Sequence, residues 1–238
     1  MKFFSLLNLP SVLLVCCINL LPTLLFAADN LSTTEKTDPR SAIANPVAGA
    51  SRPAKFVEIP ATRETLNQIR TGGFVLYLRH GYTDNSRPDR MPNVNLNDCS
   101  TQRPLTDEGR KLARNVGEAM RKAAIPLDEI RISPLCRVKE TAAAAFPAQV
   151  PVIDETLMYT ANLTSQQKAP ILARTRHWLS APVAPGKNRV IIAHAPNLMD
   201  LIGYFPKEAT LVVFRPQAED GFKYIASIPP GLWPELLR

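Results

Sequence analysis

From residue 62 onward, short unbroken apolar runs alternate with longer amphipathic segments. Unbroken runs are typical of strands that are buried on both faces of a sheet, because such strands have no solvent side. The strand candidates are 74–78, 129–132, 150–153, 188–193, 209–214 and 222–228. The last two are separated by a polar turn at 218–221, which predicts a hairpin.

Helices are expected between these strands, and the best defined follows Thr106. Thr106 is a suitable N-cap, and Asp107 and Glu108 lie in the positive first turn. Its apolar face comprises Leu112, Val116, Ala119, Met120 and Ala123. Ser133 and Pro134 resemble an N-cap and first position of another helix. Further helices are expected at 62–70, 164–179 and 195–202.

The alternation of strands and helices predicts an α/β fold, a three-layer α/β/α sandwich around a mainly parallel sheet. The 238 residues, 45% of them hydrophobic, suffice for one domain and are few for two. We place this domain at 61–238. Residues 28–60 are rich in Ser, Thr, Ala and Pro, which favours a flexible linker.

The first 27 residues form a distinct leader. Lys2 precedes a Leu- and Val-rich stretch that ends at Ala27, as in a secretory signal peptide. A membrane anchor is the alternative, and a lipoprotein linked through Cys16 is a weaker one. Cleavage is favoured because Asn and Pro interrupt the apolar run. The mature chain would then be periplasmic or secreted, with no stable membrane insertion.

Charge and cysteine content bear on the kind of ligand that the protein binds and on whether it carries a disulfide. The whole chain carries a net charge of +7, and loss of Lys2 with the leader leaves +6. No basic run or finger motif accompanies this charge, which argues against nucleic acid and is compatible with an anionic substrate. Only Cys99 and Cys136 remain after cleavage, and in an exported chain they can form a disulfide or stay as two free thiols.

Two histidines stand where strand candidates end. His80 follows the run 74–78 and Arg79, and His194 follows 188–193. Because ligands of open α/β sheets bind beyond the carboxyl ends of the strands, the two histidines are expected to share a site. Arg137 also lies at a strand-to-helix junction. His177, beside Trp178 in a helical stretch, is interpreted as structural.

The stretch from Tyr82 to Arg103 is long, polar and rich in Pro, Asn and Asp. In a compact fold, such a long excursion is usually either a functional loop or a disordered one. We expect this excursion to form a wall of the active site. Arg87, Arg90 and Arg103 could select an anionic substrate there, although solvated loop charges are the simpler interpretation.

Four motifs in order carry a family resemblance: Leu78-Arg79-His80-Gly81, Pro104-Leu105-Thr106, Ser133-Pro134-Leu135-Cys136-Arg137 and Ile192-Ala193-His194. Together they resemble the histidine phosphatase superfamily, also called the phosphoglycerate mutase-like family. The resemblance covers about residues 62–228.

The resemblance implies a phosphatase that works through a phosphohistidine on His80, with no metal and no cofactor. Arg79 and Arg137 would hold the phosphoryl oxygens, because arginine offers planar paired donors to them. His194 would donate to the transferring oxygens, and Thr83 would add a hydroxyl contact. The expected partner is a small phosphorylated substrate, and the oligomeric state is open.

The general acid is the point at which the sequence departs from the family. Where many members have a glutamate two residues after a leucine, this chain has Leu157, Met158 and Tyr159, with Glu155 before the leucine. Glu155 is the first candidate acid and Asp84 the second. Without an acid, substrates with good leaving groups become more plausible than sugar phosphates. The alternatives are a phosphate-binding protein of the same fold without turnover and a phosphomutase, which export disfavours.

Overall fold

The computed structural model describes residues 55–238, apart from residue 92. The leader and residues 28–54 of the expected linker lie outside this part. The helices are α1 (Arg63–Arg70), α2 (Asp107–Lys122), α3 (Cys136–Ala145), α4 (Ser165–Ser180), α5 (Ala195–Ile202) and α6 (Trp233–Leu236). The strands are β1 (Val75–Arg79), β2 (Leu127–Ile132), β3 (Val152–Ile153), β4 (Asn188–Ala193), β5 (Leu211–Pro216) and β6 (Phe222–Ile228).

The strands form one six-stranded sheet in the order β3-β2-β4-β1-β5-β6. The pairs β3–β2, β2–β4 and β4–β1 are parallel, whereas β1–β5 and β5–β6 are antiparallel. The predicted mainly parallel sheet with an antiparallel hairpin at one edge is therefore confirmed. In the register, Arg79 lies opposite Ala193 and Ile132 lies opposite Ile192. The residues that follow β1, β2 and β4 therefore all leave the sheet on the same side, at the carboxyl ends of these parallel strands.

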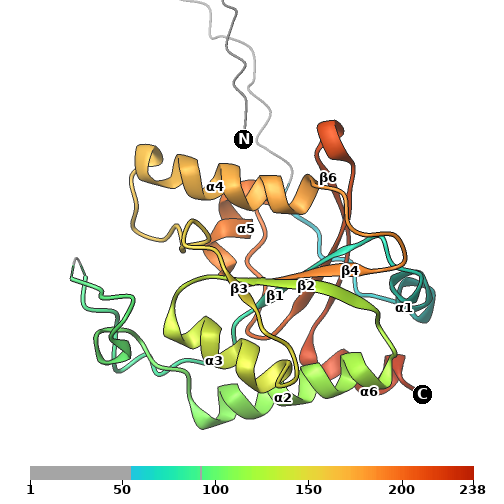
Figure 1. Ribbon diagram of the computed structural model, residues 1–238, viewed down its shortest axis with the longest axis horizontal. Coiled ribbons are helices and arrows are strands. Elements are labelled where there is room, and N and C mark those ends of the chain that lie inside the picture. The colour runs from blue at the N-terminus through green and yellow to red at the C-terminus, as the bar shows by residue number, and fades with distance from the viewer. Residues whose placement is uncertain (1–54, 92) are drawn as a thin grey trace, which may run out of the picture. The chain divides into compact units, whose positions relative to one another are not determined.

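Helices cover both faces of the sheet, as the three-layer prediction required (Figure 1). Alternate residues of β1 point to opposite layers, because side chains of a strand alternate between faces. Leu76 and Leu78 pack in the core beneath α1, α2, α3 and α6. Val75 and Tyr77 pack in the other core, with residues of α4 and α5. Every residue of β1 is buried, which explains the unbroken apolar run in the sequence.

The predicted N-cap of α2, Thr106, is confirmed, and threonines also cap α1 and α4. Thr62, Thr106 and Thr164 are the N-caps of α1, α2 and α4, and each hydroxyl accepts a backbone N–H of the first turn. The helix α2 then packs closely on the turn after β1. A Cβ on Gly109 would lie 2.2 Å from the Tyr82 carbonyl oxygen, so only glycine fits there.

The predicted start of α3 is wrong. The helix begins at Cys136, and its N-cap is Leu135, which makes no side-chain capping bond. Ser133 lies two residues before this cap, and its buried hydroxyl bonds to His194 instead. A tertiary hydrogen bond has therefore replaced the local cap. The backbone N–H of Cys136 is satisfied by Oε1 of Gln102 at 2.8 Å.

The described end of the expected linker contacts the domain. Phe56 stacks on Tyr204, with ring centroids 4.4 Å apart, and its ring lies edge-on to Tyr224. The Tyr204 hydroxyl donates to Glu58 at 2.6 Å, and Pro60 bridges to Ser227 of β6. Residues 56–60 thus pack beside β6, although the domain was predicted to begin at 61.

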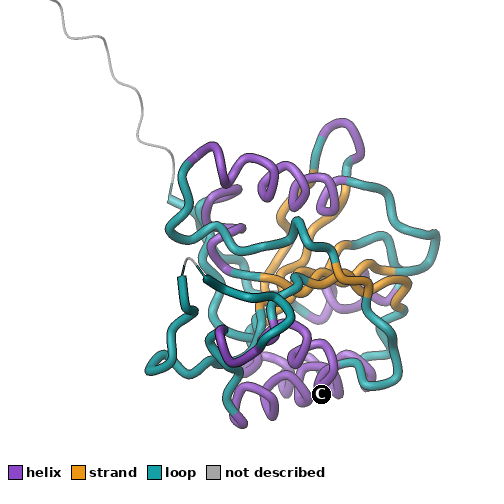
Figure 2. Tube along the Cα trace, turned by 60° about the vertical axis from the view of Figure 1, so that its left-hand side comes forward, coloured by secondary structure: helices purple, strands orange, loops and turns teal. Residues whose placement is uncertain are grey.

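Between β1 and α2 the chain makes the long excursion expected at 82–103, visible as the loop-coloured trace beside the sheet in Figure 2. A bridge between Thr83 and Leu105 joins the two ends of this excursion. Its interior contains one 3-10 turn, Cys99–Thr101. Among the described residues, no helix combines the length and apolarity that crossing a bilayer would need.

Candidate active site

His80 comes directly after β1 and is buried. Its Nδ1 lies 2.8 Å from the carbonyl oxygen of Gly81. The Gly81 N–H in turn donates to the Thr141 hydroxyl at 3.2 Å, one turn along α3 from Arg137. Burial, followed by the charges of Arg137 and Arg79, lowers the pKa of His80 to about 3. The ring is therefore neutral at pH 7, with its Nδ1 proton held by a main-chain carbonyl.

His194 comes directly after β4 and lies beside His80, with the ring centroids 5.4 Å apart. Its Nε2 is 2.8 Å from the Ser133 hydroxyl. The Tyr77 hydroxyl donates to the His194 carbonyl at 2.7 Å and accepts its N–H at 3.0 Å, which fixes the backbone. Burial, with the charge of Arg137, holds the pKa of His194 well below its usual value. Ser133 and Tyr77 were not predicted as site residues.

Two arginines flank the histidines, and each has an acidic partner. Arg79 donates to Glu208 and to the Pro206 carbonyl, both at 2.6 Å. Arg137, only 1% exposed, donates through Nη1 to Asp89 at 2.9 Å. The Nε atoms of both arginines are buried and have no partner among the described residues. The Arg79 guanidinium is thus oriented by two bonds and that of Arg137 by one, and each retains a donor for a ligand.

Arg103 is a third cation at this site. Its Nη1 donates to the neutral Asn85 amide at 3.1 Å, and its Nε is buried without a partner in the described part of the chain. Its charge lowers the pKa values of both histidines, which places it within electrostatic reach of them. No acidic side chain described in the structure lies within ion-pair distance of Arg103, so its charge is not neutralised locally.

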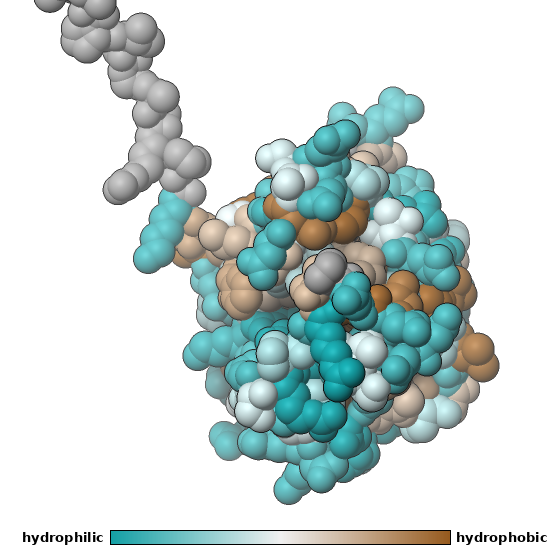
Figure 3. Space-filling model, turned by 90° about the vertical axis from the view of Figure 1, so that its left-hand side faces the viewer, coloured by the Kyte–Doolittle hydropathy of each residue, from teal (hydrophilic) through white to brown (hydrophobic). Residues whose placement is uncertain are grey.

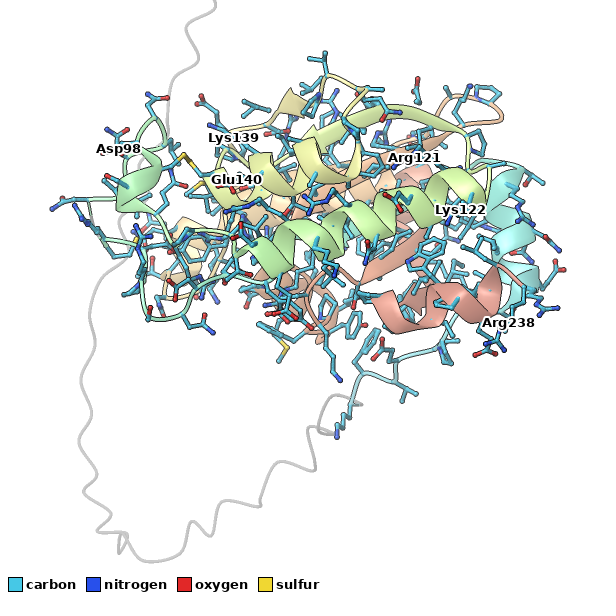
Figure 4. All side chains as sticks on the ribbon, turned by 90° about the horizontal axis from the view of Figure 1, so that it is seen from below. Asp98, Arg121, Lys122, Lys139, Glu140 and Arg238 are labelled. Carbon is cyan, nitrogen blue, oxygen red and sulfur yellow. A yellow bond between two sulfur atoms is a disulfide. The ribbon has the colours of Figure 1, made fainter. Side chains whose placement is uncertain are left out.

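A disulfide between Cys99 and Cys136 ties the excursion to the start of α3. Figure 4 shows it as the yellow bond between the turn that carries Asp98 and the helix that carries Lys139 and Glu140. The sequence had left open whether these two cysteines pair. The bond adjoins Arg137, so it anchors the loop next to the candidate phosphoryl-binding arginine.

These side chains line one cavity of about 380 Å³ at the carboxyl ends of the parallel strands. Its lining comprises Arg79, His80, Pro88, Asp89, Met91, Arg103, Arg137, Tyr159, Ala161, Asn162, His194, Pro196 and Phe205. Figure 3 views the molecule from the side on which the excursion lies, and the lower half of this face is largely hydrophilic. A larger cavity, of about 540 Å³, lies between α2 and α6, and the described residues that line it include no histidine or arginine.

Residues 75–181 match the model of the histidine phosphatase superfamily, branch 1. Over this segment the chain is similar to the histidine phosphatase superfamily. The matched segment includes Arg79, His80 and Arg137 and ends before His194. The position of His194 in the cavity is therefore an independent structural observation.

Solved structures with similar chain traces include three phosphatases. They are the protein histidine phosphatase SixA with tungstate, phosphoserine phosphatase from Entamoeba histolytica and a mycobacterial glucosyl-3-phosphoglycerate phosphatase. The identities are 15%, 13% and 17%, and the TM-scores are 0.45, 0.46 and 0.44. The matches cover 66%, 66% and 65% of this chain and 97%, 97% and 98% of those chains. No curated protein matches the chain.

Several predicted site residues lie away from the cavity. Glu155 is exposed and is absent from the lining. Asp84 accepts both the N–H and the hydroxyl of Ser86 in the loop, and Thr83 lies in the bridge at its stem. The carboxylate that does line the cavity is Asp89. No pattern in the sequence distinguished Asp89 from the other acidic residues of the excursion.

The other arginines of the excursion, Arg87 and Arg90, are exposed, as expected for solvated charges. His177 is also exposed and lies edge-on to Trp178, outside the cavity. In the described part of the chain, no three His, Cys, Asp or Glu side chains gather in a way that could hold a metal ion.

Proposed function

We propose that this protein is an exported phosphatase that hydrolyses a phosphomonoester or a related phosphoryl compound through a phosphohistidine on His80. The observation that carries the proposal is the state of the His80 ring. It is neutral, and its Nδ1 is bonded to the Gly81 carbonyl. A neutral ring protonated on Nδ1 keeps its lone pair on Nε2, the form that a nucleophilic histidine needs.

Three guanidiniums around the cavity support phosphoryl binding. The charge of a phosphoryl group in transit is spread over its equatorial oxygens, so catalysis depends on oriented donors. Arg79, Arg103 and Arg137 each have a buried Nε without a described partner. Unpaired buried donors are costly unless a ligand accepts from them, and an oxyanion is the matching ligand.

His194 would act on the same oxygens. The Ser133 hydroxyl can donate to Nε2, which leaves the proton of the neutral His194 ring on Nδ1. In that tautomer the second histidine is a hydrogen-bond donor beside the first. The reaction as proposed requires neither a metal nor an organic cofactor.

Two features support export. The apolar leader of the sequence is typical of a signal peptide, and the Cys99–Cys136 disulfide fits an oxidising compartment. Export in turn favours a hydrolase over a phosphomutase, whose phosphorylated substrates are cytoplasmic.

The test is hydrolysis of 4-nitrophenyl phosphate combined with trapping of the intermediate from a radiolabelled phosphoryl donor. The wild-type chain is expected to turn over and to yield label that is stable in alkali and labile in acid, as a phosphohistidine is. His80→Ala should lose both turnover and label, while retaining affinity for inorganic phosphate. His177→Ala is the matched control, because this exposed imidazole lies outside the cavity, and it should behave like the wild type.

Two results would contradict the proposal. Phosphate binding by the wild type without turnover of any aryl phosphate would indicate a binding protein of the same fold. Turnover with label retained in His80→Ala would show that another residue is the nucleophile.

A further inference from the structure

The cavity contains a carboxylate that the reaction described above does not use. Asp89 belongs to the excursion between β1 and α2, and it is the one acidic side chain among the described residues that line the cavity. Its Oδ1 accepts from Nη1 of Arg137 at 2.9 Å and from the backbone N–H of Arg103 at 2.8 Å. Two donors from different segments therefore fix its position.

The groups that face Asp89 come from three segments. Arg137 belongs to α3, Arg103 to the end of the excursion, and Tyr159 to the connection between β3 and α4. Burial, followed by the negative charge of Asp89, raises the pKa of Tyr159. The Arg137 guanidinium also lies over the Tyr159 ring, 5.3 Å from its centroid. Asp89 is thus embedded in the phosphoryl-binding cluster.

We propose that Asp89 is the general acid and base of this site, donating its carboxyl proton to the leaving oxygen and later activating water. The inference rests on the proposed function. Asp89 makes no hydrogen bond to His80, and it shares Arg137 with the phosphoryl group. A general acid must reach the leaving oxygen, and Asp89 is the acidic side chain among the described residues that line the cavity.

Substrate binding would change the charge around Asp89. In the free protein its carboxylate accepts from the Arg137 guanidinium and from the Arg103 backbone N–H. A phosphoryl dianion bound to Arg137 would add negative charge beside this carboxylate, and a neighbouring negative charge favours the neutral, proton-carrying form of a carboxyl group.

In the first step, Nε2 of His80 forms a bond to phosphorus and the bond from phosphorus to the leaving oxygen breaks. The electron pair of that bond goes to the leaving oxygen, which takes the carboxyl proton of Asp89. In the second step, Asp89 takes a proton from water while the water oxygen attacks phosphorus. The N–P bond then breaks, its electrons return to His80, phosphate leaves, and Asp89 is protonated again.

The test compares two leaving groups in the full chain. Phenyl phosphate needs protonation of its leaving oxygen, whereas 2,4-dinitrophenyl phosphate needs little. Because hydrolysis of the phosphohistidine is common to both esters, the comparison uses kcat/KM, which reports the first phosphoryl transfer. For Asp89→Asn we expect kcat/KM to fall on the order of 100-fold or more with phenyl phosphate and no more than about threefold with the dinitrophenyl ester. The alkaline limb of the phenyl phosphate pH profile should also disappear. Asp89→Glu, which restores a carboxyl group, should recover part of the phenyl phosphate rate.

Asp84→Asn is the matched control, because this carboxylate lies in the same loop but outside the cavity, and its ratio of the two rates should match the wild type. That ratio does not depend on the amount of folded protein, so partial misfolding cannot imitate the effect. An equal loss on both esters would overturn the assignment while leaving the phosphatase proposal intact. Faster turnover in Asp89→Asn would also overturn it and would identify Asp89 as an anion competing for Arg137. A wild-type chain inactive on both esters would remove the proposed function, and this inference with it.

Discussion

Replacing both Cys99 and Cys136 with serine should destabilise the domain and impair its cavity. The disulfide joins residues separated by 37 positions. Closing a loop of that length lowers the entropy of the unfolded chain by about 13 cal/mol/K, which corresponds to about 4 kcal/mol at 25 °C. We therefore expect the double variant to lose up to about 4 kcal/mol of its free energy of unfolding, since the chain-entropy model gives an upper value.

The activity of the same variant should fall as well. The excursion brings Asp89 and Arg103 to the cavity, and the disulfide fastens it beside Arg137. The bond from Cys136 N–H to Gln102 remains in the variant, so the loop keeps one anchor. We expect weaker substrate binding and slower turnover, with a folded domain retained.

Urea unfolding followed by tryptophan fluorescence measures the stability, because both tryptophans, Trp178 and Trp233, lie in the described domain. Dithiothreitol should lower the midpoint of the wild type toward that of the double variant and leave the variant unchanged. A loss of less than about 1 kcal/mol would refute the entropic reasoning, because it would mean that the unfolded chain gains little freedom. An equal effect of dithiothreitol on both proteins would show that the reagent acts elsewhere.

Three further predictions concern single side chains. Arg103→Gln should weaken competitive inhibition by inorganic phosphate about tenfold, since its Nε is an unpaired buried donor, whereas Arg90→Gln, an exposed change in the same loop, should have no effect. Ser133→Ala should leave His194 Nε2 without its partner, lowering turnover and costing about 1–3 kcal/mol of stability in thermal unfolding; unchanged turnover would refute a role for this bond. The pKa of His80, lowered to about 3, means that the unfolded chain binds a proton that the folded chain does not, so the free energy of unfolding should fall as the pH drops from about 6.5 toward 3. His80→Asn should flatten that fall in unfolding titrations, and equal slopes would contradict it.

The sequence alone was sufficient to predict the positions of His80 and His194. Each follows a strand that is buried on both faces, and the apolar runs of such strands can be read without knowing their neighbours. The parallel register then brings the two rings together, because the carboxyl ends of parallel strands lie at one edge of the sheet. Predicting the positions of these two side chains required only local sequence patterns and one rule of sheet topology.

Asp89 and Ser133 could not be predicted in the same way. Asp89 lies in a loop without periodicity, where only the bonds to Arg137 and Arg103 determine which acidic residue faces the cavity. Ser133 precedes a proline at a strand end, so local rules favour a helix cap. Its actual partner, His194, is 61 positions away in the chain. Contacts of this kind depend on tertiary packing, which no local pattern encodes.

The stem of the excursion between β1 and α2 is closed on itself. The Thr106 N–H donates to the Tyr82 carbonyl at 2.9 Å, and the Asp84 N–H donates to the Pro104 carbonyl at 3.0 Å. Because the two ends are clamped to each other, we expect changes between Asp84 and Asp89, outside the segment that carries Asp89, Cys99 and Arg103, to leave the nucleophile and the following helix in place. The excursion is therefore a suitable place for loop exchange. Grafting other tips onto the same clamp would be a direct route to altering which leaving groups the domain admits.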